Sequence, residues 1–273
     1  MSTLSQFLGG GGSSKLPLGI KDTAFYIDTL IVGGGGGPGI SGFTNAGAGA
    51  GGRVVQAFNL LVEKNVTYSI TVGGGGGSDT NGEDSVFGSL VSQGGGAGLK
   101  IGGSGGGGTP VGRAVFPSVG TYSVNDLLNA TNIISSGNDG GGVTNFPGSN
   151  FGGGGGAGSP GTDGGGGGGT QGGNGGSALI STIKGPGPYY YGAGAAGRGI
   201  LSPGVNGFGF GGANTGSAGQ NGVVVIAYRN TFPLATTIGA PTLFSALNPL
   251  GANATRTGYH VYEFTGSGSI RFN

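Results

Sequence analysis

Short apolar segments recur along this chain, and most of them run directly into glycine. In residues 65–72 (NVTYSITV), apolar residues alternate with threonine and serine, which is the pattern of a half-buried β-strand. Residues 23–32 (TAFYIDTLIV) are more continuously apolar, and both segments end in five glycines. The pattern predicts four more strands, at residues 53–61, 84–91, 222–229 and 258–264. Six strands are enough for a small antiparallel β-sandwich.

Glycine makes up 76 of the 273 residues and comes in unbroken blocks. An ordered glycine loses more backbone freedom than any other residue, so the blocks must form many backbone contacts or remain disordered. The 14 Phe, the 9 Tyr and a charged fraction of only 8% argue against disorder. Collagen is excluded because glycine lacks a strict third-residue period. The blocks are residues 33–37, 73–77, 105–108, 152–156 and 164–169.

We therefore expect the glycine blocks to form a packed bundle of polyglycine II helices. This left-handed, threefold helix has no internal hydrogen bonds, so each N–H and C=O group needs a partner on a neighbouring segment. Without a Cβ atom, the helices can approach closely from all sides. The structural glycines expected at the block centres are Gly35, Gly75, Gly106, Gly154 and Gly166.

Composition predicts three regions. Residues 1–20 would be an N-terminal attachment segment, residues 21–231 a glycine-rich domain, and residues 232–273 a C-terminal tail with a strand pair. The insert at residues 109–151 contains a capping sequence, Ser123 to Asp126, before LLNATNII, which predicts one short helix. The predicted fold is all-β: an antiparallel β-sandwich that carries the polyglycine II bundle and one short helix.

The charges and reactive residues argue against several classes of function. The net charge of +1 gives no long-range attraction to nucleic acid, and the absence of cysteine excludes disulfides and Cys-based zinc sites. No apolar run is long enough to span a bilayer, and the first eight residues do not resemble a secretory signal. His260, the only histidine, lies in a strand pattern, where a packed or surface imidazole is expected. We expect no metal, no cofactor, no nucleic-acid partner, no membrane insertion and no enzymatic activity.

Aromatic residues beside glycine are the candidate binding residues. They are Tyr189, Tyr190, Tyr191, Phe208 and Phe210, and we expect them to cluster at one end of the bundle. They have two interpretations. The rings can cover the sides of the glycine bundle and replace its missing core. Alternatively, they can form a rigid platform for sugars or for a protein partner, since tyrosine offers a large contact area at a small entropic cost.

The order of these segments resembles a known family. LIVGGGGG, TYSITVGGGGG, DSVFGSLVSQGGGAG and GGSGGGG, closed by QNGVVVIAYRN at residues 220–230, resemble the glycine-rich domain of bacteriophage tail and virion proteins. The same pattern resembles the glycine-rich region of the anaplastic lymphoma kinase receptor. By composition, the chain is also similar to polyglycine II tail-fibre adhesins of T-even-like phages.

The end of the chain resembles tail proteins from phages of aquatic bacteria, through NTFPLATTIGAPT and TGYHVYEFTGSGSIRF. The resemblance implies a virion protein of the tail fibre or tail tip, extracellular after lysis, that acts as a host-binding adhesin. Its expected partners are other phage tail proteins, a host cell-surface glycan or outer-membrane protein, and further copies of itself. The alternative is a purely architectural virion component, such as a decoration protein or a filament subunit. No catalytic residues come with this resemblance.

The tail raises one question about strand pairing. In the resembling domains, a segment like YEFTGSGS precedes the LIVGGGGG strand as the opening strand, whereas here it lies near the other end of the chain. We expect the tail to complete a sheet, either in its own chain or at an open edge of the next copy.

Overall fold

The computed structural model describes residues 23–39, 47–108, 132–142, 151–165, 172–197, 207–213, 217–245 and 256–273. Over these residues the chain is all-β: it forms thirteen strands and no helix. Every strand pair is antiparallel. The strands are β1 (Ala24–Val32), β2 (Val54–Glu63), β3 (Thr67–Thr71), β4 (Ser85–Phe87), β5 (Leu90–Ser92), β6 (Asn132–Ser136), β7 (Leu179–Ser181), β8 (Tyr189–Tyr191), β9 (Val223–Arg229), β10 (Thr236–Ile238), β11 (Thr242–Ser245), β12 (Tyr259–Phe264) and β13 (Gly268–Arg271).

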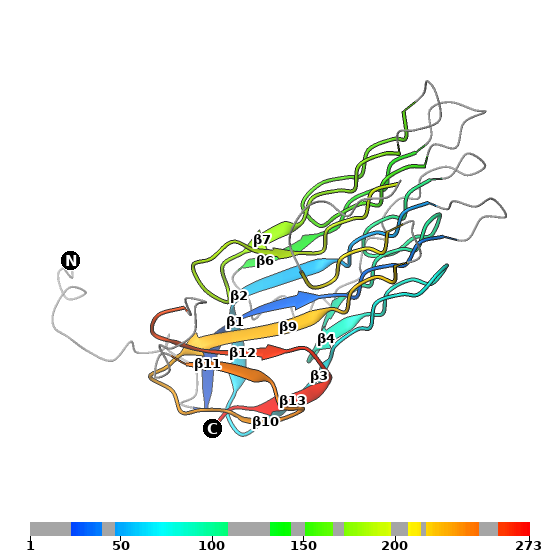
Figure 1. Cartoon of the computed structure of the whole chain (residues 1–273). Helices are drawn as coiled ribbons and strands as arrows, with labels where there is room; N and C mark the ends of the chain where they lie inside the picture. Colours follow the sequence, from blue (N-terminus) through cyan, green and yellow to red (C-terminus); the bar gives the residue numbers. More distant parts are fainter. Residues whose placement is uncertain are drawn as a thin grey trace, which may run out of the picture.

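Two sheets pack face to face, and a hairpin covers part of the outer side (Figure 1). The larger sheet has the order β11-β12-β9-β1-β2-β6, and the smaller sheet has the order β10-β13-β3-β4-β5. The hairpin is β7-β8. The core between the two sheets is rich in aromatic rings, of which Tyr228, Phe25, Phe87, Phe264 and Phe272 are the largest fully buried side chains.

The central strands of the larger sheet are buried on both faces. In β1, Phe25, Ile27 and Ile31 point into the core between the sheets. Leu30 and Val32 point outward, into a second apolar cluster that includes residues of the β7-β8 hairpin. Burial on both sides explains why β1 reads as a nearly continuous apolar run rather than a clean alternation.

All six strand predictions correspond to strands of the structure, with one difference. Residues 84–91 form two short strands, β4 and β5, joined through Gly88, whose φ of 57° lies in the left-handed region that favours glycine. The sequence did not reveal β6, β7, β10 and β11, or that the three tyrosines of β8 form a strand. Each of these strands has only three to five residues, which is too short for a periodic signal.

The predicted short helix is wrong where the structure describes it. Residues 132–134, the end of LLNATNII, belong to β6, which pairs with β2 at the edge of the larger sheet. The β-branched Ile133 and Ile134 favour a strand, and Ile133 packs against the core. Residues 123–131 lie outside the described residues.

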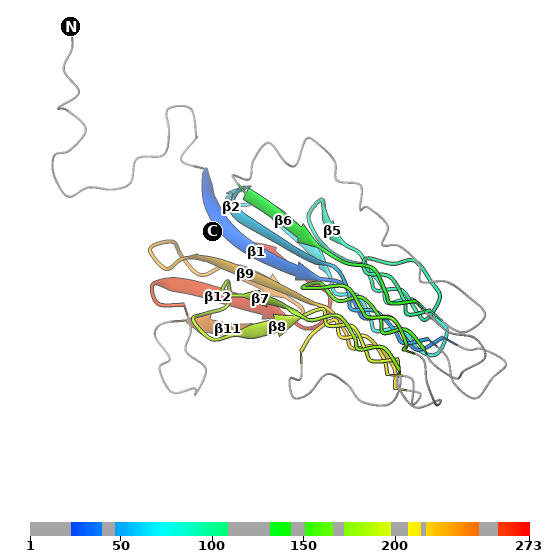
Figure 2. The same cartoon turned by 90° about the horizontal axis from the view of Figure 1, so that it is seen from above.

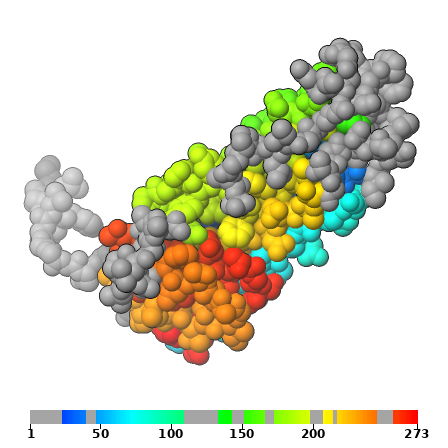
Figure 3. All heavy atoms as spheres, viewed as in Figure 1, coloured from blue at the N-terminus to red at the C-terminus, as the bar shows by residue number. Residues whose placement is uncertain are grey.

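The tail supplies one interior strand to the larger sheet and one to the smaller sheet. β12 lies between β9 and β11, and β13 lies between β3 and β10. Both strands therefore pair within their own chain. Most of the visible tail residues gather at one end of the molecule, orange and red in Figure 3. The boundary predicted near residue 231 stays a prediction.

The glycine segments extend together from one end of the sheets (Figures 1 and 2). The described residues of these segments belong to no β-strand or α-helix, yet their backbones are closely hydrogen-bonded to one another. In the segment 33–39, every third N–H group donates to the same neighbouring segment, residues 47–53. The donors are Gly33, Gly36 and Gly39, and the acceptors are the carbonyls of Arg53, Ala50 and Gly47, respectively.

The remaining groups of this segment bond to other neighbours. The N–H groups of Gly34 and Gly37 donate to Glu83 and Thr80, and that of Gly35 donates to Gln220. The carbonyls of the segment accept N–H bonds from a different set of residues, namely Gly76, Asp79, Gly95, Gly98 and Gly212. The segment is therefore bonded on all sides, as a backbone without internal hydrogen bonds requires.

Polar side chains complete the bonding where no further glycine segment is the partner. Oxygen atoms of Glu83, Asn221, Asp84, Asn81 and Asp163 accept N–H bonds at distances of 2.6–3.2 Å. Their donors are Gly74, Gly75, Gly94, Ala97 and Gly142, respectively.

Four of the five predicted structural glycines lie too close to another backbone for any side chain. A Cβ atom at Gly35, Gly75, Gly106 or Gly154 would lie 1.8–2.1 Å from a carbonyl oxygen. Real Cβ atoms essentially never approach another atom so closely, so backbone would have to shift. Gly166 lies outside the described residues.

This packing predicts a sharp contrast between two glycine-to-alanine substitutions. Gly154→Ala would place Cβ 2.1 Å from the carbonyl oxygen of Gly49, whereas Cβ at Gly77 would meet nothing within 4 Å. Overpacking typically costs about 1–3 kcal/mol, which lowers the melting temperature of a chain of this size by about 2–10 °C. We expect that loss for Gly154→Ala and an unchanged or slightly higher melting temperature for Gly77→Ala. Equal effects in calorimetry would contradict the packing.

Candidate functional site

Three of the predicted aromatic residues pack onto the outer face of the larger sheet. Tyr189 and Tyr191 belong to β8, and Phe208 forms an isolated β-bridge with Tyr191. All three rings belong to or pack against the cluster that contains Val225 and Val261. Tyr191 is only 2% exposed, so its ring contributes to the core and not to an open surface.

The other two predicted residues lie beside this group. Tyr190 is half-buried on β8, opposite Ile180, which is 55% exposed. The ring of Phe210 lies against Gly207, where an added Cβ would come within 2.3 Å of Phe210 Cζ. The five residues are thus brought together where the glycine segments leave the sheets. Whether they bind a ligand stays a prediction.

A cavity of about 320 Å³ lies at this position. Its lining residues are Gly207, Phe208, Gly219, Gln220 and Asn221. Gln220 and Asn221 are exposed, and Asn221 Oδ1 accepts the N–H bond of Gly75 at 3.0 Å. An aromatic wall beside two side-chain amides can contact the apolar face of a sugar and hydrogen-bond its hydroxyl groups.

Gln220 and Asn221 were not among the residues predicted from the sequence. They appear there only as the polar start of the segment that leads into β9. Their position beside Phe208 depends on the bonding of the glycine segments, through the contact of Gln220 N–H with the Phe210 carbonyl. A sequence motif could not have revealed this contact.

A buried ion pair connects the hairpin to the tail. Lys184 Nζ lies 2.7 Å from Glu263 Oε2, and the two side chains are 13% and 9% exposed. The ammonium group also lies 5.1 Å from the ring centroid of Tyr189 and 4.8 Å from that of Phe244. The pair therefore holds β12 of the tail against the segment between β7 and β8.

This environment changes the acidity of Tyr191. Burial raises the pKa of its phenol well above the usual tyrosine range, and the Glu263 carboxylate and Tyr189 add to the shift. Tyr191 serves as a packed ring in the cluster on the outer face of the larger sheet.

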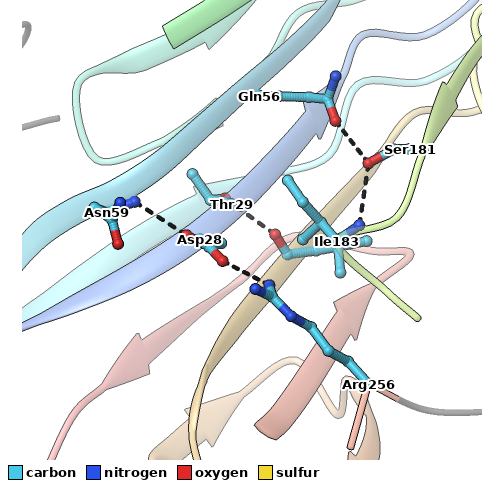
Figure 4. Close-up of polar contacts among 8 residues, drawn as sticks. Asp28, Thr29, Gln56, Asn59, Ser181, Ile183 and Arg256 are labelled. Carbon is cyan, nitrogen blue, oxygen red and sulfur yellow. Dashed lines mark hydrogen bonds and ion pairs between the residues drawn. The ribbon is translucent and has the colours of Figure 1, made fainter. Parts of the chain in front are cut away.

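Two separate groups of polar contacts lie on the outer side of the larger sheet (Figure 4). The Ser181 hydroxyl donates to Gln56 Oε1 at 2.7 Å and accepts a hydrogen bond from the N–H of Ile183 at 3.3 Å. Farther from the glycine segments, the carboxylate of Asp28 accepts bonds from Asn59 N–H and from Arg256. Asn59 has a φ of 52° and lies opposite the irregularity between Ile27 and Thr29 in the β1-β2 pairing.

The potential metal-ligating side chains are dispersed in the described ranges. No group of three or more potential metal-ligating side chains comes together there. His260 is 7% exposed, and its ring packs edge-on against Tyr228 at 5.4 Å, so the packed imidazole expected from the sequence is confirmed. None of the described segments forms a helix long and apolar enough to cross a membrane.

The chain belongs to the glycine-rich domain family, whose family model matches residues 13–229. This match ends with the last residue of β9, so β10 to β13 lie beyond it. Searches of curated proteins and of solved structures gave no match.

The buried ion pair generates a stability prediction. Lys184→Met would leave the Glu263 carboxylate buried without its partner, which typically costs about 3–5 kcal/mol. We expect the double variant Lys184→Met/Glu263→Met to recover most of that loss in urea unfolding. Lys100→Met is the control, because Lys100 and Asp79 form an ion pair whose side chains are each 44% exposed. Its loss should stay within about 1 kcal/mol. Similar losses for the two lysine variants would contradict a structural role of the buried pair.

Proposed function

We propose that this chain is a structural protein of a bacteriophage virion, located in the tail fibre or tail tip, that binds the host surface. The observation that carries the proposal is the cavity formed by Phe208, Gln220 and Asn221 on the tightly bonded glycine segments. Membership of the glycine-rich domain family and the sequence resemblance to tail proteins support it. The partners are other tail proteins, a host glycan or outer-membrane protein, and further copies of the chain. The protein acts in the virion, extracellularly after lysis, and without enzymatic activity.

We also propose that the glycine segments form a packed bundle of polyglycine II helices beside a β-sandwich. The bonding of segment 33–39 supports this, since every third N–H group donates a hydrogen bond to the same neighbouring segment, residues 47–53. This spacing is expected for a helix with three residues per turn. None of the described glycines in blocks 33–37, 73–77, 105–108 and 152–156 has a positive φ. A negative φ in an extended threefold helix corresponds to the left-handed form.

Such a bundle suits a protein that must present a binding surface rigidly. Each segment is held by backbone bonds over its length, so little conformational entropy remains to be lost on binding. The cavity lies where several such segments meet the sheets. The described lining residues are therefore already held in place before a ligand binds.

A purely architectural role is the second candidate. It is favoured by the packing of Tyr189, Tyr191 and Phe208 against the larger sheet, because these rings then replace missing core instead of meeting a ligand. In this role, the chain would form part of the virion without contacting the host.

Labelling and competition distinguish the two roles. Antibodies against the chain should label the tail tip or fibre of virions of the phage that encodes it, as seen by electron microscopy. The purified chain should compete with these virions for adsorption to host cells. Gln220→Arg fills the cavity from an exposed position and should weaken competition about tenfold, as loss of a polar contact at a binding site can do.

Thr242→Arg is the matched control, because Thr242 is exposed on the edge strand β11 and does not line the cavity. It should compete like the unchanged chain. Labelling of virions without any competition would support the architectural role, and the absence of labelling would refute both.

A further inference from the structure

A second cluster of aromatic and charged residues lies on the outer face of the larger sheet. Two guanidinium groups contact one ring there: the Cζ atoms of Arg256 and Arg229 lie 3.8 Å and 4.8 Å from the ring centroid of Tyr259. Arg229 and Tyr259 are direct partners in the β9-β12 pairing. Because both guanidinium groups lie against the Tyr259 ring, the two positive charges of Arg229 and Arg256 are held close to each other.

Only one of these cations is neutralised within the cluster. Arg256 Nη1 lies 2.6 Å from Asp28 Oδ2, and the other carboxylate oxygen of Asp28 accepts the Asn59 N–H bond at 3.0 Å (Figure 4). Asp28 is 8% exposed, and both of its carboxylate oxygens accept a hydrogen bond within the protein. Arg229 is exposed and has no carboxylate within 4 Å in the described part of the chain.

The cluster lies on the face of the sheet, over strands that are interior in the strand order. β9 lies between β1 and β12, β12 lies between β9 and β11, and β1 lies between β2 and β9, whereas β11 is the edge strand. A ligand at the cluster is therefore recognised through the side chains of the face, which include Tyr26, half-buried on β1 two residues before Asp28.

We infer that this cluster, defined by Arg229, Arg256, Tyr259 and Asp28, binds a saccharide that carries a carboxylate. Asp28 holds Arg256 in place, and the excess positive charge is located at Arg229, whose planar donor groups match a carboxylate in a bidentate geometry. The half-buried ring of Tyr26 on the same face supplies apolar contact for the sugar. The choice of a saccharide rests on the proposed host-surface function, whereas the anionic group follows from the charges of the cluster.

Titration calorimetry with defined oligosaccharides tests this site. The probe is a hexasaccharide of alternating glucuronate and N-acetylglucosamine, and its carboxyl-reduced form is the neutral comparison. The full chain should bind the acidic form and not the reduced form. Arg229→Gln should weaken binding at least about tenfold, because a charge-assisted bidentate contact is lost.

Arg271→Gln is the matched control. It removes the same charge from another exposed position, where Arg271 hydrogen-bonds Asn65 at 3.1 Å. It should change the affinity less than about twofold, as expected for a screened surface charge. Equal losses for the two variants would show nonspecific attraction and overturn the site. Absence of binding, equal binding of the reduced form, or tighter binding of a phosphorylated oligosaccharide or a glutamate-rich peptide would also overturn it.

This result is separable from the host-surface function. If the chain competes with virions for adsorption but binds no acidic saccharide, only the saccharide site is refuted. If it binds the acidic hexasaccharide but does not compete, the site stands and the host-surface function is refuted.

Discussion

The structure depends on hydrogen bonds between glycine backbones that have no side chain between them. A segment such as 33–39 makes no bonds to itself, so each polar group must meet a neighbour at the correct height and rotation. The absence of Cβ atoms permits the approach, because a Cβ at Gly35 would lie only 1.9 Å from the Phe210 carbonyl oxygen. The same absence removes the side-chain contacts that normally specify which segments pair. The partners must therefore be specified elsewhere in the chain.

The sheets provide much of that specification. β1 continues into the segment 33–39, β2 is preceded by the segment 47–53, and β9 is preceded by residues 217–222. Because β1 pairs with both β2 and β9, these three segments leave the larger sheet side by side. The N–H groups of Gly33 and Gly35 then donate to the carbonyls of Arg53 and Gln220. Segments that follow or precede neighbouring strands therefore remain neighbours in the glycine region. Oxygens of side chains such as Asn221 and Asp163 complete the bonding.

The sequence was most informative where apolar residues form long runs and least informative within glycine. The strands β1, β2, β3, β9 and β12 could be predicted because the apolar patterns that contain them extend over seven or more residues of the sequence. Short edge strands such as β10 and β11 could not, since three or four residues carry no period. The aromatic group around β8 could be named in advance. Its packing could not, because Tyr191 is buried through contacts with distant strands. The same reason hid the pair of Lys184 and Glu263 and the two arginines on Tyr259.

Amide hydrogen exchange of the glycine segments tests this account most directly. Glycines in the blocks 33–37 and 152–156 should exchange slowly, at rates comparable to those of the central strand β1, because their N–H groups are bonded and buried. Exposed Gly77 should exchange faster and serves as the internal reference. Exchange of the block glycines at the rate of an unstructured peptide, while β1 remains protected, would contradict the view that backbone bonds between glycine segments hold this part of the protein together.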